Sequence, residues 1–263
     1  MDPTVLPSQS VFVGLGILLG FGSLVSIWGE KGDRIESLAI FGAAGVAGIL
    51  GARLLWAFAS PEGPLVGGAI WWSVVDPSVP GFWSFGGLSL GGLTAWAASR
   101  QISGQKAWRR LDRVVPAGFS TLASARFGCL SAGCDFGRVT DFAWGLRYPS
   151  GTMAWHAHVD AGLVPAGSGW SLPTHPFPMY MVGVTLVAVV VGEIASRSLD
   201  RREGVQALVT AGCYLTGRIL TEALRSPHAE SVLRGAFLNV SQVLGAGGLG
   251  LLIIIAWIRR ERR

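Results

Sequence analysis

Residues 38–59 read LAIFGAAGVAGILGARLLWAFA, a run of 22 residues in which Arg53 is the only charged side chain. About 20 mostly apolar residues in an α-helix span the hydrocarbon core of a bilayer, so this run predicts a transmembrane helix. Six other runs have the same character, at residues 11–28, 82–98, 114–134, 177–196, 205–224 and 237–258. The sequence therefore predicts an all-α, polytopic integral membrane protein with about seven transmembrane helices.

The composition of the chain agrees with lipid as its solvent. Half of the 263 residues are hydrophobic and 14% are charged, whereas soluble domains carry about 25% charged residues. The 38 glycines suit close helix packing, and the 11 tryptophans suit the membrane interface. The net charge is +5, but the basic residues are divided among short segments between the apolar runs. This pattern indicates membrane topology, with the bilayer and no nucleic acid as partner.

The distribution of Lys and Arg predicts the orientation. Segments after the first, third, fifth and seventh runs hold 14 of the 21 basic residues, segments on the other side hold 4, and 3 lie within runs. Because cytoplasmic segments carry the excess of Lys and Arg, we expect the N-terminus outside and the C-terminus in the cytoplasm. No Lys or Arg precedes Lys31, so the first run lacks the basic start of a signal peptide and is expected to be a retained helix.

The longest segment outside the predicted spans, residues 135–176, is not apolar enough to cross a bilayer. It contains Trp144, Trp155 and Trp170, together with three of the four histidines. A segment rich in Trp, Gly and Pro at this position is typical of an ordered cap at the membrane interface. We therefore expect one transmembrane domain over residues 1–263, with an extracytoplasmic cap at about residues 135–176.

Charged residues inside the predicted spans indicate a functional site. An Arg in mid-membrane costs about 2.5–3.5 kcal/mol and needs a partner or a polar cavity. The fourth span contains Arg126, and Tyr214, Arg218, Glu222 and Arg225 share one face of the sixth helix at offsets of 4, 8 and 11. A simple Arg218–Glu222 pair would leave Arg126 unexplained. Since two guanidinium groups match a phosphate bidentately, we favour a site for the phosphate of a lipid head group.

A glycine-rich stretch follows Arg126, where residues 125–141 read ARFGCLSAGCDFGRVTD. The glycines at 128, 133 and 137 are dense enough to break a regular helix and to let the backbone approach a ligand. The pattern Arg-x-Gly-x4-Gly-x3-Gly-Arg, which ends at Arg138, resembles the signature of the prolipoprotein diacylglyceryl transferase family.

Other segments resemble the same family in the same order along the chain. They are Gly51-Ala52-Arg53, the glycine-rich residues 83–92, Trp144-Gly145-Leu146-Arg147-Tyr148-Pro149, His175-Pro176-Phe177-Pro178-Met179-Tyr180, the run Tyr214-x3-Arg218-x3-Glu222-x2-Arg225-x-Pro227, and Gln242. The resemblance covers most of the chain. It is specific because the motifs occur jointly.

The resemblance implies a transferase of the bacterial inner (cytoplasmic) membrane. Such an enzyme moves diacylglycerol from phosphatidylglycerol to a cysteine thiol beside the signal peptide of a lipoprotein precursor, without a cofactor or metal. Arg126 and Arg218 would grip the phosphate, Glu222 would orient Arg218, and Tyr214 would line the head-group site. The substrate-binding residues implied are Arg126, Gly128, Gly133, Gly137, Arg138, His175, Arg225 and Gln242.

Several positions depart from the family pattern. Cys129 stands where an Asn is usual, Cys134 where an acid is usual, and Leu90 where a His is usual. Val13 and Pro178 likewise replace a Tyr and a Gln. The sequence therefore resembles a divergent, cysteine-containing branch. Two alternatives stay open: a related lipid transferase with another acceptor, or a non-catalytic lipid-binding membrane protein.

The cysteines and histidines are the remaining candidates for chemistry. Cys129 and Cys134 are read as catalytic candidates, either bridged, free and reactive, or simply packed. A regular helix would hold them about 140° apart, although Gly133 could relax that angle. His156 and His158 could supply the base that Leu90 cannot, since His titrates near neutral pH, or they could be solvated residues of a loop.

Overall fold

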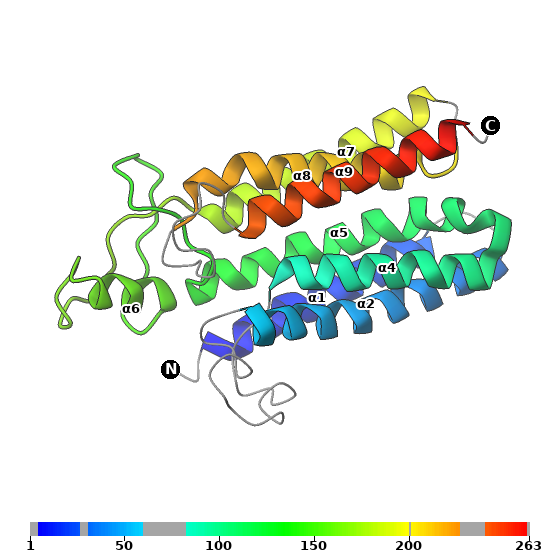
Figure 1. Ribbon diagram of the computed structural model, residues 1–263. Helices are drawn as coiled ribbons and strands as arrows, with labels where there is room; N and C mark the ends of the chain where they lie inside the picture. Colours follow the sequence, from blue (N-terminus) through cyan, green and yellow to red (C-terminus); the bar gives the residue numbers. More distant parts are fainter. Residues whose placement is uncertain (1–4, 27–30, 60–82, 200, 227–239, 262–263) are drawn as a thin grey trace.

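The computed structural model describes residues 5–26, 31–59, 83–199, 201–226 and 240–261, in which every regular element is a helix. The long helices are α1 (Val5–Ser26), α2 (Lys31–Ala59), α4 (Ser84–Ser103), α5 (Ala107–Ala132), α7 (Phe177–Ser198), α8 (Val205–Thr221) and α9 (Val240–Glu261) (Figure 1). The short helix α6 (Met153–Asp160) and the 3-10 turns Gly104–Lys106 and Glu222–Leu224 complete the set.

Each predicted apolar run overlaps one of the seven long helices, so the all-helical prediction is confirmed over the described residues. Residues 27, 28, 82 and 237–239 of those runs lie outside them. Three helical segments are long and apolar enough to cross a membrane, namely Gly32–Phe58, Phe177–Ser198 and Ser241–Arg259. These segments are consistent with a membrane protein.

The helices run roughly along one direction in two groups, with α7, α8 and α9 on one side and α1, α2, α4 and α5 on the other (Figure 1). Helix α5 joins the groups because it packs against α7 and α8 as well as α1, α2 and α4. Helices α2 and α4 approach closely through glycines. A Cβ on Gly51 would collide with the carbonyl oxygen of Gly86 and come within 2.6 Å of the Leu90 side chain. Such contacts between small residues are the usual means by which membrane helices associate.

Ion pairs fasten the bundle at the end away from α6. The buried side chain of Arg110 bonds to Asp33 and to Glu36, the latter at 2.9 Å, and Ser103 donates to Glu36 at 2.6 Å. Asp112 accepts hydrogen bonds from the first amides of the α8 region. These contacts connect helices α2, α4, α5 and α8 at one end of the bundle. The candidate site lies at the opposite end.

The segment between α5 and α7 is held by hydrogen bonds although it contains only one short helix. Four isolated bridges pair residues 137 with 225, 139 with 174, 146 with 174, and 149 with 170. Thr152 is the N-cap residue of its helix α6, and the Thr152 hydroxyl accepts from the amide of Trp155 and so satisfies a free helix-end donor. This segment covers the end of the bundle where α5 ends and α7 begins (Figure 1).

Candidate functional site

Arg126 is buried near the end of α5, two turns before the helix ends. Its Nη1 lies 2.5 Å from Oδ2 of Asp135, and its Nη2 donates to the hydroxyl of Ser84 at 2.9 Å. Ser84 is the first residue of α4. The guanidinium therefore connects α5, the start of α4 and the turn that follows α5.

The polar stripe predicted on the sixth helix also meets this point. Arg218 and Glu222 are buried and paired with each other, and Nη1 of Arg225 lies 3.3 Å from Oε1 of Glu222. The regular helix α8 ends at Thr221, so Glu222 stands in a 3-10 turn and Arg225 has an extended backbone. The continuous helical face is therefore wrong beyond Thr221, yet the turn still directs these side chains to one place.

Asp135 joins the two arginine groups, and sequence reasoning missed it. Its Oδ1 lies 2.8 Å from Nε of Arg225, while its other oxygen holds Arg126. Burial alone would raise the pKa of Asp135, but Arg225 and Arg126 overcome that effect and hold the pKa below its usual value. The acid expected where Cys134 stands is thus present one residue later. The sequence did contain a signal for Asp135, because this acidic residue lies two positions after Gly133, a glycine expected to break the helix.

The cluster carries more positive than negative charge. Three arginines (Arg126, Arg218 and Arg225) face two carboxylates (Asp135 and Glu222), which gives 3 − 2 = +1 among the described residues. The Nε atoms of Arg126 and Arg218 are buried without a hydrogen-bond partner in the described part of the chain. Buried charges are costly unless they are compensated, so the cluster is suited to one anionic group.

Aromatic residues surround the deepest guanidinium. The Arg218 carbon Cζ lies 5.1 Å from the ring centre of Phe177 and 5.8 Å from that of Phe85, which are cation–π distances. Tyr214, one turn before Arg218, is buried against Phe119 with ring centres 4.8 Å apart. The Tyr214 hydroxyl also neighbours the Arg126 guanidinium, so this tyrosine belongs to the same cluster.

Gly137 lies between the segments that carry His175 and Arg225. Its amide donates to the His175 carbonyl at 3.1 Å, and residues 137 and 225 form an antiparallel bridge. A Cβ on Gly137 would lie 2.6 Å from the His175 carbonyl oxygen and 2.8 Å from that of Leu224. Glycine is therefore required for this close approach. The neighbouring Arg138 is exposed, and its Nε donates to the Arg225 carbonyl at 3.2 Å.

The turn after α5 brings the two cysteines together. Gly133 adopts a left-handed conformation (φ +66°), and the amide of Cys134 donates to the carbonyl of Cys129 at 3.1 Å. This is the Schellman arrangement, in which the side chains of the two bonded positions come into contact. The 140° separation of a regular helix therefore does not apply. Both thiols are free and partly buried.

The three histidines of residues 135–176 differ in burial and in their contacts. His158 is buried, its Nδ1 accepts from the Leu172 amide at 3.2 Å, and its ring meets Phe136 edge-on. His156 is exposed on α6, so neither histidine lies in the arginine cluster. His175 is the histidine beside Gly137, with its Nδ1 3.1 Å from the Tyr180 hydroxyl. Burial lowers the pKa of His175, which favours the neutral form.

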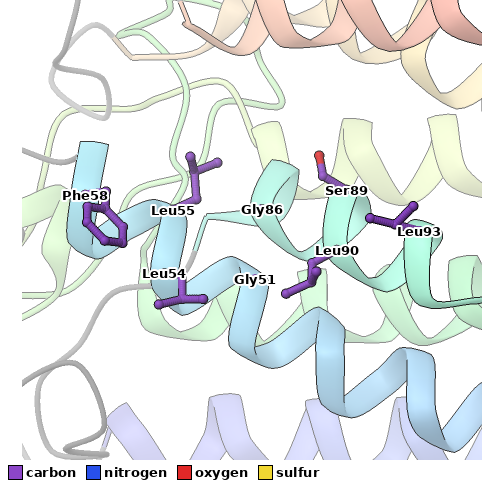
Figure 2. Close-up of a pocket in the computed structure, with 8 residues that line it drawn as sticks. All are labelled: Gly51, Leu54, Leu55, Phe58, Gly86, Ser89, Leu90 and Leu93. Carbon is purple, nitrogen blue, oxygen red and sulfur yellow. The ribbon is translucent and has the colours of Figure 1, made fainter.

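The remaining predicted positions lie on helices of the bundle. Gly128 is buried on α5, and Gln242 is partly buried near the start of α9. Leu90 points into an apolar groove between α2 and α4 (Figure 2). The groove is lined by Gly51, Leu54, Leu55, Phe58, Gly86, Ser89, Leu90 and Leu93. Among these described residues, none has an acid–base group that could replace the missing histidine.

Fold and site together are those of a helical protein, consistent with a membrane protein, that has a buried cluster of net positive charge. The chain belongs to the prolipoprotein diacylglyceryl transferase family, whose sequence model matches residues 6–258. This confirms the family predicted from the glycine-rich and arginine motifs.

Curated relatives in several genera carry the name phosphatidylglycerol–prolipoprotein diacylglyceryl transferase. The protein of Legionella pneumophila strain Lens is 29% identical over 269 residues, which cover 97% of this chain and 94% of the relative. That of Pectobacterium carotovorum strain PC1 is 27% identical, with 99% and 94% covered. That of Vibrio vulnificus strain CMCP6 is 31% identical over 181 residues, with 66% and 58% covered.

Proposed function

We propose that this protein transfers diacylglycerol from phosphatidylglycerol to the cysteine thiol of a lipoprotein precursor. The observation that carries the proposal is the buried +1 cluster of three arginines and two carboxylates. A phosphodiester carries one negative charge and would neutralise it. Arg126 and Arg218 each have an Nε without a hydrogen-bond partner among the described residues, and such a ligand could accept from it. The names of the relatives supply the substrate class.

The reaction moves charge toward this cluster. A base takes the proton of the acceptor thiol. The thiolate sulfur then attacks the carbon of the diacylglycerol unit that is bonded to the phosphate oxygen. A C–S bond forms, the C–O bond breaks, and glycerol phosphate leaves with the electron pair. A diester and a thiolate, each with one negative charge, become a neutral thioether and a phosphate monoester with two. Guanidinium groups fixed around the phosphate therefore stabilise the charge that grows on the leaving group.

We assign the base to His175 rather than to the earlier candidates, His156 and His158. Gly137 connects His175 to the Arg225 segment, and the lowered pKa keeps the imidazole neutral and able to accept a proton. The Tyr180 hydroxyl faces its Nδ1. His158 uses its own Nδ1 for the Leu172 amide, which makes it a structural residue.

The membrane arrangement is part of the proposal. All seven long helices cross the bilayer, residues 135–176 form an extracytoplasmic cap, and the cluster lies toward the outer leaflet of a bacterial inner membrane. The opposite end of the bundle carries Arg109, Arg110 and Arg113, as a cytoplasmic end should. A reporter fused after Arg263 should report cytoplasm, and one inserted near Ala166 should report the outside. The reverse at both sites would overturn the orientation.

The direct test is transfer of labelled diacylglycerol from phosphatidylglycerol vesicles to a signal-peptide substrate by the purified protein. Arg126→Ala should abolish transfer, and Arg126→Lys should be nearly as damaging because Lys cannot form the bidentate fork. Arg197→Ala, which removes an exposed arginine, is the matched control. Transfer that survives Arg126→Ala combined with Arg218→Ala would refute the phosphate site. Lipid binding without transfer to any of several acceptor peptides would instead favour a non-catalytic lipid-binding protein.

A further inference from the structure

Tyr148 is a buried residue that the proposed mechanism does not use. Its amide donates to the Ser171 hydroxyl at 2.9 Å and its carbonyl accepts from the Ser171 amide at 2.8 Å, which fixes its backbone. The ring packs with Phe136 and Ala154, and its edge lies against Gly133 at the end of α5. Its side chain is therefore held in one position beside the cysteine turn.

The hydroxyl of Tyr148 is buried without a hydrogen-bond partner in the described part of the chain. Buried polar atoms are normally satisfied, because a lost hydrogen bond to water is not otherwise recovered. Tyr180 shows the contrast, since Trp144 donates to its hydroxyl at 2.9 Å and His175 faces it at 3.1 Å. The Tyr148 hydroxyl is thus arranged for a partner that the described residues do not supply.

The surroundings of this hydroxyl indicate what the partner is. Burial and, after it, the Cys134 thiol and the Asp135 carboxylate raise the pKa of Tyr148 to about 12. The phenol therefore stays protonated and acts as a neutral donor. The ring lies against Gly133 beside the cysteine turn, and its polar neighbours include Cys134, Asp135 and Cys129, whereas Arg126 and Arg225 are bound to the Asp135 carboxylate. The charged part of a ligand belongs with the arginines, and an uncharged hydroxyl belongs here.

We propose that Tyr148 is a specificity-determining residue that donates a hydrogen bond to a hydroxyl of the polyol head group of the lipid donor. The proposal rests on the proposed function, because the cluster fixes the phosphate from which the head group extends. A head group with hydroxyls can accept this bond, while a plain alkyl head group of equal charge cannot. A cationic amine head group would also be repelled by the net positive cluster.

The test compares two anionic lipids that differ in the head-group hydroxyls, phosphatidylglycerol and phosphatidylpropanol. Binding of each to the wild type and to Tyr148→Phe is measured by native mass spectrometry of the detergent-solubilised protein, and transfer is measured in parallel. The wild type should prefer phosphatidylglycerol by about 3- to 10-fold, the range of one neutral hydrogen bond. Tyr148→Phe should lose that preference by weakening phosphatidylglycerol alone.

The thermal midpoint separates this role from a structural one. Tyr148→Phe removes an unsatisfied buried hydroxyl, so its midpoint should equal or exceed that of the wild type. Tyr180→Phe removes a hydroxyl with protein partners and should melt lower. Equal losses for both lipids, no loss for either, or a lowered midpoint of Tyr148→Phe would overturn the proposal. A wild type that binds both lipids but transfers from neither would refute the proposed function, while the binding comparison would still decide the role of Tyr148.

Discussion

The carboxylate of Asp135 offers the sharpest test of the buried cluster, because one side chain holds two arginines from different parts of the chain. Asp135 binds Arg126 at 2.5 Å and Arg225 at 2.8 Å. The substitution Asp135→Asn keeps the size of the side chain and removes its charge. The cluster then changes from a net charge of +1 to +2, and neither arginine retains its full partner.

The expected loss follows from the burial of the pair. Removing one partner of a buried ion pair costs about 3–5 kcal/mol, because an uncompensated charge is left inside. For a chain of this size, 1 kcal/mol shifts the thermal midpoint by roughly 2–4 °C, so Asp135→Asn should lower it by about 6–20 °C. The matched control is Glu193→Gln, which breaks an exposed i,i+4 pair with Arg197. Exposed pairs contribute about 0–1 kcal/mol.

The assay is thermal unfolding in detergent followed by circular dichroism, with and without phosphatidylglycerol. Added anionic lipid should stabilise Asp135→Asn more than it stabilises the wild type, since the variant has a larger positive charge to neutralise. If Asp135→Asn melts no lower than Glu193→Gln, the two contacts of Asp135 contribute nothing and the reasoning from buried charge is refuted.

Three further predictions concern other parts of the site. Gly137→Ala should destabilise by about 1–3 kcal/mol and reduce transfer, because its Cβ would press on two carbonyls, and thermal unfolding beside a transfer assay measures both. Because burial lowers the pKa of His175, the fold keeps its full stability above the unfolded pKa near 6.5 and loses stability as pH falls through the folded pKa. His175→Gln removes this protonation, so it should flatten the fall of the thermal midpoint below pH 6.5. Cys129→Ser, Cys134→Ser and the double variant should reduce lipid transfer if the thiols take part in the chemistry; wild-type transfer in all three, with free thiols by alkylation mass spectrometry, would show them to be packing residues.

The helices could be predicted from the sequence because a chain in lipid must satisfy its backbone hydrogen bonds internally. Boundaries were less accurate where helices extend past the apolar run. Helix α2 begins at Lys31, seven residues before the predicted run, because Asp33 and Glu36 pair with Arg110 of α5. Hydropathy cannot register such an extension, since it depends on a tertiary ion pair.

The arginines of the site could be predicted from the sequence, but one of the two carboxylates that neutralise them, Asp135, could not. Arg126 and Arg218 were identified because an unpaired charge in a span is costly, and both are buried in the cluster. Asp135 was missed because its position depends on backbone geometry: it has a positive φ of 55°, which residue spacing does not reveal. Likewise, His156 and His158 are close in sequence to the site motifs, yet helix α6 directs them elsewhere.

The left-handed turn after α5 explains how a divergent signature retains a charged site. Gly133 ends the helix and folds Cys134 back to Cys129, which places the following residue, Asp135, against Arg126. The position where the family resemblance expects an acid has become a thiol, but the negative charge is still present one residue later. Arg126 is therefore compensated by a carboxylate although Cys134 supplies none. Because Tyr148 packs on the same glycine, the turn also places beside Cys129 and Cys134 a phenol that has no hydrogen-bond partner among the described residues.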